Sequence, residues 1–334
     1  MPPVTKAGSL ASSAPAEQVG AGMPLDPHAN RFLRMLAAGG FPNVSEIDAE
    51  AVRAAFVRLA RAVDAQDEPI GSIENRDIPG PHGPLAIRIY SPIGGNAGPL
   101  PGLLYFHGGA WVFCNLDTHD GLCRLLANAS GCRIVSVGYR QAPEYKLPAP
   151  IDESYAAATW LAEHAAELAI DPRRIAIGGD SAGGTLAAAV CQMALRNGGP
   201  KLALQVLLCP KTDVSADTDS RRAFAKGYFF DRATLDWAIQ QACPPGFDLK
   251  DPRVSPLRAS DLSGQPPAEI HTAEFDPLRD EGKAYADRLA QAGVRVRYTC
   301  HSGMIHHFYA MAGIIPYART ALAGVGGAIR EALR

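Results

Sequence analysis

Ser181 lies between two glycines in the run Gly179-Asp180-Ser181-Ala182-Gly183. The stretch 174–177, apolar after Arg174, predicts a strand before it, and the run rich in small residues at 182–197 predicts a helix after it. A serine between close glycines at a strand-to-helix turn is typical of a nucleophile elbow, where a tight, strained turn exposes the hydroxyl. The first amides of the helix and its positive dipole end would face the same point. Ser181 is therefore the candidate nucleophile.

A serine hydroxyl needs an acid and a base to become nucleophilic. The candidate acid is Asp276, in the loop after a predicted strand at 268–273, with Glu274 and Asp280 as weaker rivals. Capping of the following helix is an alternative reading, since Asp276 precedes a proline. Three histidines, His301, His306 and His307, follow a predicted strand at 294–299, and spacing alone does not separate them as the base.

Donors for a developing oxyanion are expected upstream of the serine. The apolar run 103–106 predicts a buried strand, and His107-Gly108-Gly109-Ala110-Trp111 follows it directly. Glycine lets the backbone approach a ligand closely. Gly109 and Ala110, with Ala182 after the nucleophile, are the predicted oxyanion donors, and a simple tight turn is the alternative for the upstream pair.

The elements around these residues alternate between strand and helix. This pattern predicts an α/β fold with a mostly parallel sheet and helices on both faces. The predicted strands are 73–78, 85–90, 103–106, 133–137, 174–177, 204–209, 268–273 and 294–299. The predicted helices are 27–36, 48–63, 119–130, 151–168, 182–197, 232–242, 280–292 and 316–333. The alternation breaks at about 211–266, which we interpret as an insertion forming a cap together with the helices of 23–70. Residues 71–334 would then be the catalytic domain.

Composition excludes several classes of protein. The 32 basic and 34 acidic residues give a net charge of −2, and no basic run predicts binding to nucleic acid. Seven cysteines, an odd number without Cys-x-x-Cys spacing, indicate free thiols in the cytoplasm, with neither disulfides nor a zinc site. No stretch approaches the roughly 20 apolar residues of a membrane span, and residues 1–22 are interpreted as a disordered tail without a secretory signal.

Several motifs, in this order over about 70–330, resemble the hormone-sensitive-lipase-like carboxylesterases (bacterial family IV), in their Gly-Asp-Ser-Ala-Gly branch. They are 107–111, Asp117-Thr118-His119-Asp120, 137–144, 179–184, 276–281 and Gly303-Met304-Ile305-His306-His307-Phe308. The resemblance implies an α/β-hydrolase fold with a helical cap, and it places the base at His306. His307 stands where the family has glycine, Ala110 where it has a third glycine, and Tyr139 where it more often has aspartate.

The implied function is hydrolysis of small-molecule carboxylic esters with short-to-medium acyl chains, without a metal or organic cofactor. Candidate substrate-binding residues are Gly108, Trp111, Asp180, Tyr228, Phe229 and Trp237. Asp180 has a second interpretation as a structural hydrogen-bonding residue beside the elbow, and the aromatic residues as ordinary packing. A homodimer through the C-terminal strand and helix is one assembly that the resemblance implies. Two alternatives stay open: amide or formamide hydrolysis on the same triad, and a non-catalytic small-molecule receptor of the same fold.

Overall fold

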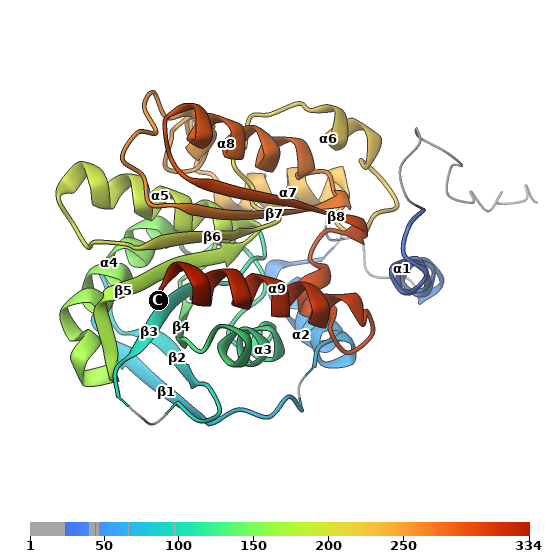
Figure 1. The fold of residues 1–334 in the computed structure, drawn as a ribbon. Coiled ribbons are helices and arrows are strands. Elements are labelled where there is room, and N and C mark those ends of the chain that lie inside the picture. Colours follow the sequence, from blue (N-terminus) through green and yellow to red (C-terminus); the bar gives the residue numbers. More distant parts are fainter. Residues whose placement is uncertain (1–23, 40–43, 45–46, 66, 96–97) are drawn as a thin grey trace, which may run out of the picture.

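The computed structural model describes residues 24–39, 44, 47–65, 67–95 and 98–334. The tail expected at 1–22 lies outside the described residues. The strands form an eight-stranded sheet in the order β1-β2-β4-β3-β5-β6-β7-β8 (Figure 1). Their bounds are β1 Ser72–Ile78, β2 Leu85–Ser91, β3 Leu100–Phe106, β4 Arg133–Gly138, β5 Ile170–Asp180, β6 Leu204–Leu208, β7 Ala268–Phe275 and β8 Val296–Ile305. Strands β1 and β2 pair antiparallel at one edge, β2 joins β4 antiparallel, and the strands from β4 to β8 are parallel. The predicted α/β class is therefore confirmed.

Helices cover both faces of the sheet. The bounds are α1 Pro27–Gly39, α2 Ala49–Val63, α3 Asp120–Ser130, α4 Ala149–His164, α5 Ala182–Asn197, α6 Asp219–Ala223, α7 Arg232–Ala242, α8 Arg279–Gln291 and α9 Tyr317–Ala332. Three short 3-10 turns are η2 Ala165–Leu168, η3 Pro256–Arg258 and η4 Phe308–Met311. Helices α3 and α9 pack together on one face, while α4, α5 and α8 cover the other (Figure 1).

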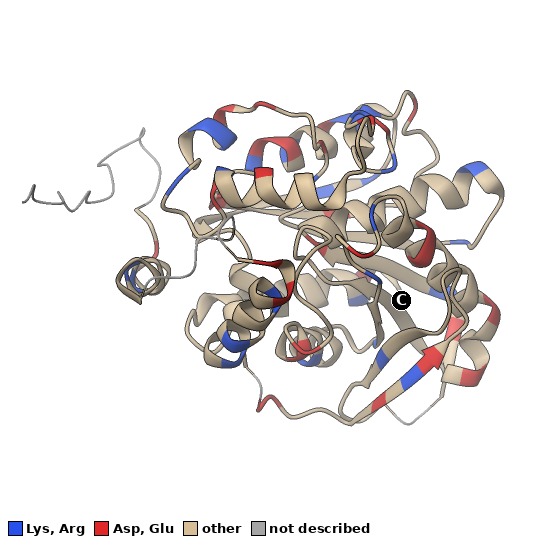
Figure 2. Cartoon of the chain, turned by 180° about the vertical axis from the view of Figure 1, so that it is seen from behind, with Lys and Arg blue, Asp and Glu red and all other residues tan. Residues whose placement is uncertain are grey.

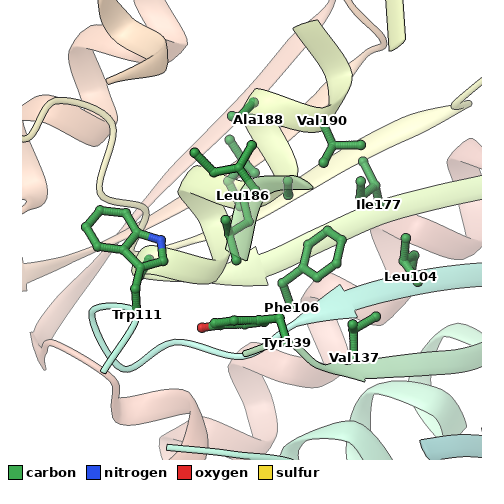
Figure 3. Packing of buried hydrophobic residues seen from close by; sticks show 14 of the residues in the cluster. Leu104, Phe106, Trp111, Val137, Tyr139, Ile177, Leu186, Ala188 and Val190 are labelled. Carbon is green, nitrogen blue, oxygen red and sulfur yellow. The ribbon is translucent and has the colours of Figure 1, made fainter. Parts of the chain in front are cut away.

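The parallel strands are apolar on both faces because helices cover both. In β3, Leu103 and Tyr105 point to the α3 and α9 side, and Leu104 and Phe106 point to the other side. This is the two-residue alternation of a strand, and all four side chains are buried. Full burial of each such side chain contributes about 1.5–3 kcal/mol relative to exposure. Figure 3 shows Leu104 and Phe106 packed beside Val137 and Ile177 of the neighbouring strands.

The N-terminal helices meet the 228–230 segment at the carboxyl ends of the strands. Phe56 of α2 stacks on Phe113 of the loop after β3 at 4.2 Å between ring centroids. Phe32 of α1 contacts Phe229 edge-on at 5.3 Å. Helix α2 also holds that loop through Arg53, which donates to the Val112 carbonyl at 2.8 Å. Both segments predicted to form a cap thus converge on one end of the sheet.

Four strands extend two or more residues beyond their predicted bounds, and the first of them, β3, begins at Leu100 rather than at residue 103. Strand β5 begins at Ile170 rather than at residue 174, β7 continues to Phe275, and β8 continues to Ile305. Polar residues such as His301 interrupt the apolar pattern in these extensions, although backbone pairing with the neighbouring strand continues. The extension of β8 carries the chain directly to His306.

Charges of both signs are interspersed over the surface, as on the β1–β2 edge and the outer helices in Figure 2. Many form short-range pairs, for example Arg76 with Glu74 at 2.6 Å and Lys283 with Asp287 at 2.5 Å. Among the described residues, no helix is long and apolar enough to cross a membrane.

Candidate active site

Ser181, Asp276 and His306 come together where three parallel strands end. Ser181 follows β5, Asp276 follows β7 and His306 follows β8. The His306 Nδ1 atom lies 2.8 Å from Asp276 Oδ2, and His306 Nε2 lies 3.1 Å from Ser181 Oγ. Because a carboxylate only accepts, Nδ1 carries the proton and Nε2 is free to accept from the serine hydroxyl. The three side chains form a continuous chain of hydrogen bonds.

The rival acid and base candidates are engaged elsewhere. Glu274 accepts from the Gly303 amide at 2.8 Å, and Asp280 accepts from the Ser220 amide at 2.7 Å. His301 lies inside β8 with Nε2 at 3.2 Å from His271 Nδ1, and burial lowers its pKa to about 4. None of these residues contacts Ser181.

The elbow is strained at the serine itself. Ser181 has φ 52° and ψ −118°, outside the regions that ordinary residues favour. A Cβ at Gly183 would come within 1.9 Å of the Phe106 carbonyl oxygen, so a side chain there is sterically excluded. The glycine after the serine therefore allows helix α5 to begin directly against β3.

Electrostatics favour the protonated form of the candidate base, His306. Burial disfavours the charged form of His306, but the adjacent Asp276 outweighs this effect and raises the pKa of His306 above its usual 6.5. The Cys209 thiol lies beside the same carboxylate, and its Sγ is within 4.8 Å of ligand atoms of Asp276 and His306. Burial, together with the nearby Asp276, raises the pKa of Cys209 well above its usual value, so this sulfur stays a thiol.

The three amides predicted as oxyanion donors have no acceptor within the described protein. Gly109 and Ala110 have φ of 107° and 51°, so two successive residues adopt left-handed backbone geometry in the loop after β3. In the described part of the chain, neither amide donates a hydrogen bond to protein. The Ala182 amide opens helix α5 and, like other first-turn amides, has no acceptor within its helix. The amides of Gly109, Ala110 and Ala182 are thus free of protein acceptors among the described residues, as the predicted oxyanion role requires.

Asp180 organises a buried network beneath this loop. Its Oδ1 accepts from the Tyr105 hydroxyl at 2.9 Å and from the Gly108 amide at 3.0 Å, and lies 3.1 Å from His119 Nε2. Its Oδ2 lies 3.3 Å from His307 Nδ1. Burial alone would raise the pKa of Asp180, but the two histidines outweigh it and hold that pKa well below its usual range. The carboxylate therefore links the elbow, the oxyanion loop and the histidine loop.

His307, in place of the family's glycine, has left-handed backbone geometry with φ 65°. An imidazole in this conformation carries a steric cost that glycine avoids. Its ring lies against Phe229 at 6.3 Å and against His119 at 5.2 Å between centroids. Burial lowers the pKa of His307, so the ring is neutral and donates from Nδ1 to Asp180. Tyr139, the other departure in sequence, stacks on His107 at 4.3 Å and donates to its carbonyl at 2.8 Å.

The candidate substrate-binding residues differ in their placement. Trp111 is buried in the loop after β3, and Figure 3 shows its indole beyond the end of that strand. Phe229 is half-buried between Phe32 and Phe56. Tyr228 stacks on Phe275, and Trp237 is half-buried on α7. The contacts of Asp180 and Gly108 are those of the buried network.

Reasoning from sequence missed three residues near the serine. His119 belongs to a motif noted in the sequence, but only the fold brings it to Asp180. Cys209 follows β6 beside Asp276, with no local pattern to mark it. Lys211 follows two residues later, and its amide donates to the Ser181 carbonyl at 3.0 Å. A lysine directly after an apolar strand was the available signal.

Comparison with known proteins identifies the family of the chain. A family model described as alpha/beta hydrolase fold matches residues 103–310. The chain is 45% identical over 242 residues to the carboxylic ester hydrolase LipN of Mycobacterium tuberculosis, covering 71% of this chain and 64% of LipN, just under two thirds. It is 38% identical to an arylesterase of Saccharolobus solfataricus, covering 86% of this chain and 92% of that protein.

Solved structures extend the agreement to the whole fold. An ester hydrolase from the metagenome of Lake Arreo superposes with a TM-score of 0.90 at 40% identity, covering 92% of this chain and 98% of that one. An esterase of Pyrobaculum calidifontis superposes with a TM-score of 0.88 at 38% identity, covering 92% and 99%. The chain therefore belongs to the α/β hydrolase fold family, in its hormone-sensitive-lipase-like branch of carboxylic ester hydrolases.

Proposed function

We propose that the protein hydrolyses carboxylic esters of short-to-medium acyl chain length, with Ser181 as nucleophile, His306 as general base and Asp276 as its orienting acid. The observation that carries this proposal is the unbroken hydrogen-bond chain from Asp276 through His306 to Ser181. The ester hydrolases and esterases among its relatives and solved structures support the same reaction.

The reaction follows from the proton positions. His306 Nε2 takes the Ser181 proton as the serine oxygen attacks the ester carbonyl, and Asp276 stabilises the imidazolium. The amides of Gly109, Ala110 and Ala182 bind the oxyanion of the tetrahedral intermediate. His306 then protonates the leaving alcohol, leaving an acyl-serine. Water, deprotonated by the same imidazole, attacks that acyl group and returns the free serine and a carboxylic acid.

The oxyanion donors and the pocket residues belong to this proposal as well. The Ala110 methyl narrows the space beside its amide compared with glycine, which limits bulky groups near the carbonyl. The substrate-binding roles of Trp111, Tyr228, Phe229 and Trp237, the cap, the cytoplasmic location and the homodimer stay predictions.

Initial rates with p-nitrophenyl esters from acetate to laurate test the proposal. Wild-type protein should turn over the short esters, and Ser181→Ala should lose that activity while keeping its circular dichroism spectrum. Ser302→Ala, an exposed serine on β8, is a matched control that should retain wild-type rates. Folded wild-type protein without activity on any ester in the series would contradict the proposal and direct attention to amide substrates.

A further inference from the structure

Lys211 is a buried lysine beside the nucleophile that the mechanism does not use. It is 2% exposed, and its amide and its carbonyl are fixed by Ser181 and Thr185 respectively. Within the described chain, no hydrogen bond or ion pair engages its Nζ; the ammonium lies over the Trp111 ring, 5.6 Å from the centroid. A buried lysine whose ammonium has an aromatic face but no hydrogen-bond or ion-pair partner is costly, so an anionic partner supplied by a ligand would explain its position.

The Trp111 side chain, over which Lys211 lies, carries a further hydrogen-bond donor without a partner among the residues described. The Trp111 indole Nε1 is buried and has no hydrogen-bond partner in the structure. Trp111 follows the oxyanion residues Gly109 and Ala110 directly, and Lys211 is held to the Ser181 backbone. Buried polar groups are nearly always paired, so the buried indole N–H of Trp111, beside an ammonium that makes no hydrogen bond to the described chain, calls for an acceptor. An N–H and an ammonium together suit a carboxylate.

The neighbouring acidic groups do not take this role. Glu281 on α8 already pairs with Arg221 of α6 at 2.6 Å and accepts from the Thr212 amide at 2.8 Å. Asp236 on α7 is exposed and pairs with Arg232. Lys211 thus keeps a net positive charge that no described neighbour neutralises through a direct contact.

The protonation state of Lys211 suits recognition of an anion near neutral pH. Burial, reinforced by Arg221, lowers the pKa of Lys211 to about 8, while Glu281, Asp236 and the half-buried Cys243, just after α7, act in the opposite direction. The side chain is therefore mostly a cation at pH 7 and loses its charge above about pH 8.

The two ends of an ester can be assigned to two sides of the site. The leaving alcohol must lie beside His306, which protonates it, and the Phe230 ring lies 5.3 Å from the His306 ring. Lys211 instead lies on the side of the Ser181 backbone and of Trp111. With the alcohol placed beside His306, the side of Lys211 and Trp111 is left for the acyl substituent.

We propose that Lys211 and the Trp111 indole bind a carboxylate at the far end of the acyl chain, so that monoesters of dicarboxylic acids are preferred substrates. This inference rests on the proposed esterase function and adds its substrate class. Hydrolysis of such a monoester releases the alcohol and the dicarboxylate through the same acyl-serine.

The experiment compares monomethyl esters of malonate, succinate, glutarate and adipate with neutral methyl esters of matched chain length, by pH-stat. The readout is the ratio of kcat/KM for the anionic ester to that for its neutral match. Lys211→Met should lower this ratio roughly 10- to 100-fold for the chain length that fits, because a charge-assisted contact is lost. Lys201→Met, which removes an exposed charge ahead of β6, should leave the ratio unchanged.

Two further measurements complete the test. In the wild type, the ratio should fall several-fold between about pH 7 and about pH 9 as Lys211 deprotonates. Titration of His306 affects the hydrolysis of both esters equally, so it cancels in this ratio. The pH series needs no variant, so it decides the matter even where Lys211→Met does not fold. The acetate ester of γ-hydroxybutyrate, an isomer of monomethyl glutarate with its carboxylate on the alcohol, should show no such dependence.

The outcomes separate cleanly. A ratio that stays within twofold in Lys211→Met and across the pH series would overturn the inference, as would wild-type protein that hydrolyses neutral esters but no anionic monoester. A loss confined to the acetate ester of γ-hydroxybutyrate would overturn the acyl assignment. Failure with neutral and anionic esters alike would instead refute the esterase function itself.

Discussion

Replacing Asp180 by asparagine should destabilise the fold although Asp180 is not part of the triad. The carboxylate accepts from the Tyr105 hydroxyl and the Gly108 amide, and its oxygens also lie within hydrogen-bond distance of His119 and His307. Asparagine keeps one acceptor oxygen for two of these donors. Its amide group, however, offers a donor where His307 also donates, and the negative charge is gone.

The magnitude follows from what is left unpaired. Charge-assisted hydrogen bonds contribute about 1.5–3 kcal/mol each, and the contacts to His119 and His307 both lose that character. Two such losses sum to about 3–6 kcal/mol, and rearrangement of the buried donors lowers the upper end of this range. We therefore expect Asp180→Asn to lower the free energy of unfolding by about 3–5 kcal/mol. Because the Gly108 amide is no longer fixed as firmly, kcat/KM should fall on the order of 100-fold.

The assay is urea unfolding followed by circular dichroism at several pH values. The pKa of Asp180 is held below its unfolded value of about 3.9. Its stabilisation is therefore present above that value and is lost as the pH falls through the lower folded pKa. The gap between wild type and Asp180→Asn should be constant from about pH 5 to about pH 8 and should narrow below about pH 4.

Asp287→Asn is the matched control, because Asp287 is an exposed carboxylate on α8 that pairs with Lys283. Its urea midpoint should stay at the wild-type value. A loss below about 1 kcal/mol in Asp180→Asn at neutral pH would refute the reasoning, since the buried network would then not depend on a charged acceptor.

Three further predictions concern the triad and its neighbour. Ser181→Ala should lower kcat about 10⁶-fold with little change in the unfolding midpoint, and retained activity would exclude Ser181 as nucleophile. On the acid side, kcat/KM should begin to fall above pH 6.5, because Asp276 raises the pKa of His306 and the protonated imidazole cannot accept the serine proton. A value of kcat/KM that does not change down to pH 5 would contradict a histidine base. His307→Gly should relieve a left-handed residue by about 1–2 kcal/mol and lose a charge-assisted contact of about 1.5–3 kcal/mol, for a net loss near 1 kcal/mol. Its kcat/KM should fall less than tenfold, whereas His306→Ala should fall at least a thousandfold; the reverse ranking would move the base.

The fold and the elbow could be predicted from the sequence because each depends on residues that are close together in the chain. Apolar runs between turn residues predicted every strand of the sheet, and the glycines around Ser181 reflect a steric limit that the structure shows at Gly183. The buried network was not accessible in the same way. Along the chain, Asp180 is 61 residues from His119 and 127 residues from His307, and no local sequence pattern links the three. The burial of Lys211 could not be predicted from sequence, because a single lysine after a strand is ordinarily solvated; only the structure shows that this side chain is buried.

The strained backbone of this protein is concentrated where chemistry is proposed. Of the eight described non-glycine residues with positive φ, seven lie in loops after β3, β5, β6 and β8 or at the aromatic segment of the insertion: Ala110, Trp111, Cys114, Ser181, Cys209, Phe229 and His307. Each such residue costs about 1–2 kcal/mol, so this geometry persists only where surrounding contacts impose it.

Asp180 supplies much of that constraint, because it connects three of the strained loops. It directly precedes Ser181 in the elbow, and its carboxylate contacts the Gly108 amide in the loop after β3 and the His307 ring after β8. Residues that never touch substrate therefore hold the oxyanion donors, the nucleophile and the base in register. A substitution that removes volume or charge from this buried network around Asp180 should reduce kcat/KM by displacing the catalytic groups, although it alters none of them chemically. Asp180→Asn combined with His307→Gly should then lose less activity than the product of the single losses, because each variant breaks the same link.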